Sequence, residues 1–156
     1  MAWVAHTIGL LPSGLFSIAQ GTNSDGSVIV GVADSDGFGD GHAFWWTAGS
    51  GMVDLGVLSG GTQSIAYAVS ADGQFVVGQS DGGSAPPGST VAVLWHVTGG
   101  GATVTATELG YLGSGNSSAA FAISSDGTTI VGTSTIVAGD PLFLPAFPTV
   151  PPRRLR

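Results

Sequence analysis

Cysteine and lysine are both missing from this chain of 156 residues. Without cysteine the protein has no disulfide bond, no thiolate nucleophile and no cysteine-based zinc site, and the redox state of its compartment stays open. The absence of lysine excludes catalysis by an amine nucleophile. Two common routes to covalent catalysis are therefore closed.

Positive charge is absent from nearly the whole sequence. The three basic residues are Arg153, Arg154 and Arg156, at the C-terminal end, whereas residues 1–152 carry all ten acidic side chains. The formal net charge is −7. Such a surface repels a phosphate backbone, so we expect no nucleic-acid partner.

Long apolar runs are also lacking. No stretch approaches the length of a membrane-spanning helix, so we expect no membrane span. The first residues lack a basic segment followed by a long apolar one, so no secretory signal peptide is evident in this chain. Hydrophobic residues nevertheless make up 43% of the sequence and charged residues only 8%, which predicts a folded domain rather than a disordered chain.

A short unit occurs three times. Its Gly-rich landmarks are an L/I-G pair, an Asp-Gly pair and a V-G pair, and the Asp follows the first Gly by 16 residues in each copy. The copies are spaced by 47 and then 54 residues, a period typical of propellers and other repeat architectures. The landmarks are Ile8-Gly9, Asp25-Gly26 and Val30-Gly31; Leu55-Gly56, Asp72-Gly73 and Val77-Gly78; and Leu109-Gly110, Asp126-Gly127 and Val131-Gly132.

The unit is predicted to contain four short antiparallel strands. Each Asp-Gly pair lies between two runs suited to strands, a typical hairpin signal because Gly accepts a positive φ at no steric cost. The expected single all-β domain covers residues 1–147, in units of about 3–50, 51–101 and 102–147. Each unit is expected to open with its L/I-G strand, the first being 3–10. Prolines leave 142–144 as an edge strand at best, and 148–156 form a Pro/Arg-rich tail.

The combined motifs resemble a known repeat. His42-Ala43-Phe44, then the segment 52–61 (MVDLGVLSGG) and the segment 64–80 (SIAYAVSADGQFVVGQS), are similar to the HAF repeat, a repeat family of bacterial extracellular proteins. The resemblance covers roughly residues 6–135. It implies a secreted or cell-surface β-repeat protein, propeller-like in longer members, with no catalytic residues and no defined ligand.

Three units leave the mode of closure open. Closed propellers usually need four to eight blades, so three propeller-like blades would form part of a larger ring. Alternatively, three units close on themselves with pseudo-threefold symmetry, as in a β-trefoil or a β-prism. Propeller-like blades are favoured by the family likeness. Open sheet edges need covering, so we expect a homo-oligomer or a larger assembly.

An acidic glycine loop is the candidate metal site. Asp34, Asp36 and Asp40 alternate with glycines, and oxygen ligands of this kind suit Ca²⁺. The EF-hand pattern is not met, because Phe38 and Trp45 occupy two of its ligand positions. The competing interpretation is a solvated acidic turn before a strand.

Trp45 is the candidate ligand-binding residue. Alternation along a strand places Trp45 and Trp46 on opposite faces, and Trp46 aligns with Trp95 as a structural pair. Trp45 is therefore expected to be exposed, where it could bind glycans.

No catalytic residues are predicted. The sequence has no G-x-S-x-G elbow, and Glu108 is its one glutamate. We expect a non-enzymatic structural or interaction protein on a bacterial cell or virion surface, acting in assembly, decoration or adhesion. A carbohydrate-binding module is the alternative, and a hydrolase comes third.

Overall fold

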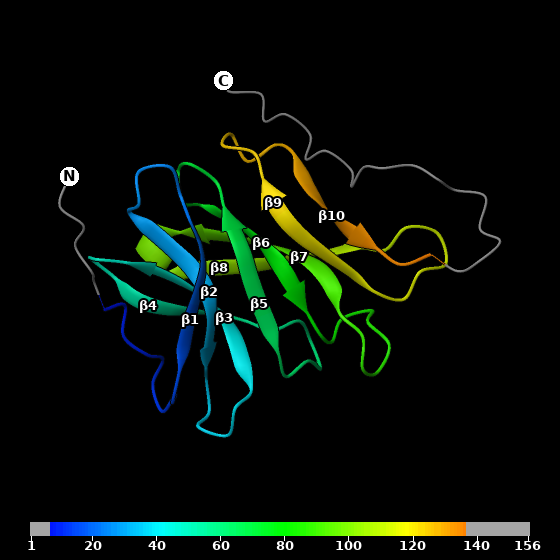
Figure 1. Cartoon of the computed structure of the whole chain (residues 1–156), viewed down its shortest axis with the longest axis horizontal. Coiled ribbons are helices and arrows are strands. Elements are labelled where there is room, and N and C mark those ends of the chain that lie inside the picture. Colours follow the sequence, from blue (N-terminus) through cyan, green and yellow to red (C-terminus); the bar gives the residue numbers. More distant parts are fainter. Residues whose placement is uncertain (1–6, 137–156) are drawn as a thin grey trace.

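The computed structural model describes residues 7–136, which form three antiparallel sheets (Figure 1). The first sheet consists of β1 (Ser17–Thr22), β2 (Val28–Asp34), β3 (Gly41–Thr47) and β4 (Gly51–Gly56). The second consists of β5 (Ser64–Val69), β6 (Phe75–Ser80), β7 (Val91–Thr98) and β8 (Thr103–Gly110), with a short 3₁₀ turn, Gly99–Gly101, before β8. The third contains β9 (Ser118–Ile123) and β10 (Ile130–Ser134). The all-β prediction is confirmed; the two four-stranded sheets are simple meanders and the third is a two-stranded hairpin.

The sheets are offset by one strand from the expected units. The Leu55-Gly56 strand, β4, pairs with β3 and so ends the first sheet, and β8 ends the second sheet in the same way. Residues 7–10, the described part of the expected first strand, form no strand. The expected edge strand 142–144 and the tail 148–156 lie outside the described residues.

The three Asp-Gly pairs form the predicted turns. They connect β1 to β2, β5 to β6 and β9 to β10, and their glycines have φ values of 74°, 74° and 73°. In each turn the Asp carboxylate accepts a hydrogen bond from the backbone N–H two residues later, at 2.9–3.0 Å. The repeated spacing in the sequence therefore reflects one turn built three times.

A β-bulge lies at the same place in the first strand of every sheet. It falls on Gln20, Tyr67 and Phe121, each between two small residues. The bulge breaks the regular alternation of small and bulky faces that the sequence suggests for these strands. Beside it lies the V-G glycine: a Cβ at Gly31 or Gly78 would come within about 2 Å of the carbonyl oxygen of the neighbouring strand. The V-G motif thus makes room for the bulged strand.

The sheets pack face to face in the order of the sequence. The blue, green and yellow first strands, β1, β5 and β9, lie side by side (Figure 1). Trp45 of the first sheet and Trp95 of the second share one buried cluster, with Val28, Val30 and Val76. A second cluster fills the space between the second and third sheets. The middle sheet is therefore covered on both faces.

A buried serine ties each sheet to the one before it. Ser64 Oγ donates a hydrogen bond to Gly56 O at 2.7 Å and accepts one from the N–H of Ala43 at 2.8 Å. These two groups lie where a bulge at Leu55 separates β3 from β4. Ser118 makes the same pair of contacts with Gly110 and Ala92. The serine completes the ladder that the bulge interrupts.

The hydroxyl of Ser64 should therefore contribute measurably to stability. Ser64→Ala leaves a buried N–H and a partly buried carbonyl without this partner, which costs about 1–3 kcal/mol in the free energy of unfolding. Ser17→Ala is the matched control, because Ser17 Oγ holds the same repeat position but makes one exposed bond, to Gly9 O at 2.9 Å. Urea denaturation of both variants measures the difference. Equal losses in the two variants would contradict this role.

Candidate functional site

Asp34, at the end of β2, is fully buried and organises the acidic loop. Its Oδ2 accepts a hydrogen bond from the N–H of Leu15 at 2.9 Å. Its Oδ1 accepts from the N–H groups of Gly37 at 3.0 Å, Asp36 at 3.3 Å and Gly39 at 3.4 Å. Both carboxylate oxygens are engaged by the backbone of the chain itself.

The pKa of Asp34 reflects two opposing effects. Burial raises the pKa, but the hydrogen bonds from the backbone of Leu15, Gly37, Asp36 and Gly39 outweigh it and leave the pKa below its ordinary value of 3.8. The charged form is therefore favoured without a cation.

Equivalent positions in the other copies make the same kind of contact. Asp81 Oδ1 accepts hydrogen bonds from the N–H groups of Thr62 at 2.8 Å and Gln63 at 2.7 Å. Thr135 Oγ1 accepts from the N–H groups of Asn116 and Ser117 at 3.2 and 3.0 Å. The side chain at the end of each second strand, or directly after it, thus holds the segment leading into the first strand of its own sheet, which is a structural role.

Asp36 and Asp40 do not join Asp34 in a shared cation site. Asp36 Oδ1 accepts a hydrogen bond from the N–H of Phe38 at 2.8 Å, and Asp40 Oδ1 accepts one from Gln63 Nε2 at 3.2 Å. Among residues 7–136, no three His, Asp or Glu side chains are grouped so that they could hold a metal ion. The calcium site stays a prediction that this arrangement does not favour.

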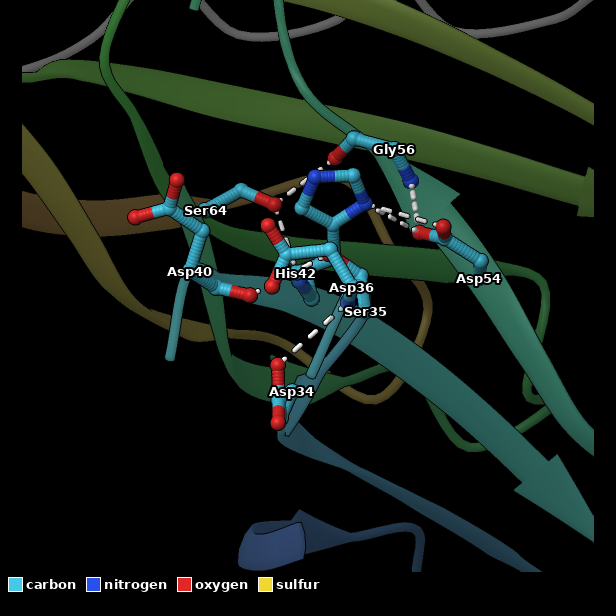
Figure 2. A network of polar contacts seen from close by, with 9 residues as sticks. Asp34, Ser35, Asp36, Asp40, His42, Asp54, Gly56 and Ser64 are labelled. Atoms are coloured by element: carbon cyan, nitrogen blue, oxygen red, sulfur yellow. Dashed lines mark hydrogen bonds and ion pairs between the residues drawn. The ribbon is translucent and has the colours of Figure 1, made fainter. Parts of the chain in front are cut away.

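His42 and Asp54 form a pair between β3 and β4. His42 Nδ1 lies 2.9 Å from Asp54 Oδ2 and 3.1 Å from Oδ1, and Asp54 also accepts a hydrogen bond from the N–H of Gly56 (Figure 2). Both side chains are partly exposed. The nearby Ser64 hydroxyl is not available as a nucleophile, because it donates to Gly56 O and accepts from Ala43 (Figure 2). The arrangement is that of a hydrogen-bonded surface pair beside a structural serine.

Trp45 is not the exposed aromatic that the sequence suggests. Its side chain is only 6% exposed, and its indole Nε1 donates a hydrogen bond to Gly73 O of the second sheet at 2.8 Å. Alternation does place Trp46 on the opposite face, where it is half-buried. The sequence argument assumed one solvated face, but both faces of the first sheet bury apolar side chains.

Two features that sequence reasoning missed lie on the surface. Phe38, in the acidic loop, is 93% exposed. The position of Phe38 in a Gly-rich loop was the sequence signal for its exposure. The sequence argument used Phe38 only as a mismatch to a calcium motif. A hollow of about 440 Å³ lies on the first sheet and is lined by Gly26, Ser27, Ile29, Trp46, Thr47, Ala48 and Gly49. None of these side chains is acidic or an imidazole.

Comparison of the chain with protein family models, with curated proteins and with solved structures gives no match. The likeness to the HAF repeat therefore rests on the sequence motifs alone. Within the described residues, no helix has the length and apolar character needed to cross a membrane.

The lowered pKa of Asp34 predicts an acid-dependent contribution to stability. The folded pKa lies below 3.8, so the stabilisation is present above that value and is lost as the pH falls through the folded pKa. We expect Asp34→Asn to lower the urea midpoint near neutral pH, and the gap to the parent protein to close below about pH 3.8.

Asp40→Asn is the matched control, since Asp40 accepts one side-chain hydrogen bond and lies in the same loop. Asp25 and Asp126 have lowered pKa values through hydrogen bonds led by Ser27 and Ser124, but parent and variant share them. A gap between Asp34→Asn and parent that stays constant down to acidic pH would show that the charge of Asp34 is not responsible.

Proposed function

We propose that this protein is a non-enzymatic β-repeat module, displayed on a bacterial cell or virion surface, which acts in assembly, decoration or adhesion. The observation that carries the proposal is that the recurring polar side chains bind backbone groups of the protein itself. The repeated serines and the residues that end the second strands bind the backbone of their own or the neighbouring sheet. These positions serve to hold the sheets together, which suits a durable structural part.

The geometry around the polar side chains supports a non-catalytic role. The hydrogen-bonded pair of His42 and Asp54 has no free hydroxyl beside it, because Ser64 is engaged twice. The two hollows on the first sheet, of about 440 and 380 Å³, are lined by no Asp, Glu or His. A hydrolase needs convergent acid and base groups next to a cavity, and neither hollow provides them.

The packing of successive sheets supports the propeller-like interpretation over a trefoil or prism. Each sheet is built from consecutive strands, and its first strand neighbours the first strand of the next sheet. Propeller blades are arranged in this way around a central axis. The three units are then consecutive blades, of which the first two end with the Leu55-Gly56 and Leu109-Gly110 strands.

The connections between the second and third strands are the surfaces that differ most between copies. Residues 35–40 form the acidic loop in the first sheet, and residues 81–90 form a longer loop with two prolines in the second. Loops that vary on a fixed scaffold commonly carry the contacts of a binding module. Phe38 is the most exposed large apolar side chain among the described residues. We therefore place the adhesive contact on these loops.

Surface display predicts where the protein is found. Antibodies raised against the purified chain should label intact source cells, or the particles released from them, in electron microscopy. Permeabilised cells are the control, since they show the total amount of protein. Labelling that requires permeabilisation and is missing from released particles would contradict surface display.

Carbohydrate binding is the second candidate, favoured by the acidic loop rather than by Trp45. Phe38 offers an exposed ring, and the neighbouring carboxylates of Asp36 and Asp40 are acceptors for sugar hydroxyl groups. On a glycan array, Phe38→Ser should abolish the signal of any glycan that the parent protein binds. Ile136→Ser, an exposed apolar side chain in the third repeat, should leave the signal unchanged. An array without signal for the parent would remove this candidate.

A further inference from the structure

The contact between neighbouring sheets occurs twice within the chain, with equivalent residues each time. At the first contact, Val28 of the first sheet lies against Gly73 of the second, so that a Cβ at Gly73 would be 2.6 Å from Val28 Cγ2. At the second, Phe75 lies against Gly127, where a Cβ would be 2.8 Å from the ring. The repeat aligns Val28 with Phe75 and Gly73 with Gly127.

Each sheet therefore has two different faces, which we define by their neighbours. The forward face contacts the following sheet, and the back face contacts the preceding one. The forward faces contain Val28, Val30 and Trp45 in the first sheet and Phe75, Val77 and Leu94 in the second. The back faces contain Val76, Val97 and Trp95 in the second sheet and Ala120 and Ile130 in the third.

The back face of the first sheet has the same design but no sheet in front of it in the described chain. Ile29 and Trp46 align with Val76 and Trp95, which are fully buried, yet they line the hollow of about 440 Å³. No described heavy atom lies within 4 Å of a Cβ at Gly26, although the equivalent positions Gly73 and Gly127 are in close contact. The hollow corresponds to the place where Val28 and Trp45 pack on the second sheet.

The forward face of the third sheet shows the complementary exposure. Val131 aligns with Val30 and Val77, which are both fully buried, but it is itself 55% exposed. Thr129 aligns with Val28 and Phe75 and is also exposed. The described chain thus presents a back face on its first sheet and, on the two described strands of its third sheet, part of a forward face of the kind that meets a back face twice internally.

We propose that the forward face of the third sheet docks onto the back face of the first sheet of a second copy of this chain. The inference deepens the proposed assembly role and rests on it. Because the two faces differ, the interface is heterologous and joins copies head to tail. Thr129 and Val131 of one copy enter the hollow beside Gly26 and Trp46 of the next.

Backbone groups on the first sheet match the polar contacts between sheets. Within the chain, the N–H of Ala71 donates to Ser125 O at 3.0 Å, and Trp45 Nε1 donates to Gly73 O. The carbonyl groups of Ser24 and Gly26 hold the equivalent positions in the first sheet. The Ser24 carbonyl is placed to accept the first of these bonds from the N–H of Ser125 of another copy, whereas the third unit has no tryptophan to supply the second.

Introducing an arginine into one face at a time tests the proposal. Ala48 and Gly49 are exposed and line the hollow, and a Cβ at Gly49 would meet no described atom within 4 Å; Ala48 aligns with the buried Val97. Ala48→Arg therefore blocks the back face, and Gly49→Arg serves the same purpose if Ala48→Arg does not fold. Val131→Arg blocks the forward face. Leu15→Arg, at a loop residue that is 74% exposed, is the control.

Sedimentation analysis of the full chain gives the outcome. We expect the parent protein and Leu15→Arg to associate, and each face variant to associate at least about tenfold more weakly. An equimolar mixture of Ala48→Arg and Val131→Arg should form complexes of two chains and none larger, because one intact interface is then available. An isologous interface could not be restored by mixing.

Three results would overturn the interface: a monomeric parent protein at concentrations up to roughly 1 mM, face variants that associate like the parent, or a mixture that stays monomeric. None of these three results bears on the proposed surface display, which the labelling of intact cells tests separately. Failure of surface labelling with intact head-to-tail association would in turn remove the proposed location and keep the interface.

Discussion

The two-way hydrogen bond of a buried serine is the constraint on which the sheets depend. A bulge in the fourth strand leaves an N–H and a carbonyl without a partner in the ladder of the first and second sheets, and the N–H is buried. Ser64 and Ser118 come from the following sheet and satisfy both groups. The bulge therefore stabilises the fold only when the next sheet is in place. One sheet alone would carry unsatisfied polar groups, so folding information is shared between neighbours.

Sequence spacing located the strands and the Asp-Gly turns because both depend on local chemistry. A Gly with φ near 74° is needed at each turn, and the residues on either side suit a pleated strand. The offset of one strand was missed for the opposite reason. Whether the L-G strand begins one sheet or ends another depends on which strand it pairs with, and pairing is a non-local property. Gly56 and Gly110 have positive φ values and lie at the ends of their sheets. A glycine at the same sequence position could equally lie at the start of a sheet, so its presence does not decide between the two.

Comparison across the repeat changes the interpretation of two candidate residues that the sequence argument considered singly. Asp34 suggested calcium because its own loop contains two more acids, whereas its alignment with Asp81 and Thr135 indicates a backbone contact that accepts either a carboxylate or a hydroxyl. A metal ligand would not be replaced by threonine in a unit that keeps the same geometry. Trp45 was placed on the surface by alternation, which orders the two faces correctly but says nothing of what covers them. Both faces of the first sheet bury apolar side chains because other parts of the chain pack on each of them.

The same stacking bears on how many sheets an assembly could contain. If each contact between sheets repeats the geometry of the one before it, successive sheets rotate about a common axis and either close into a ring or continue as a filament. Propellers close with four to eight blades. If, as proposed, each copy contributes three such units, six is the one closed number in that range, and it requires two copies. Two heterologous contacts would then cover both the back face of the first sheet and the forward face of the third sheet in each copy.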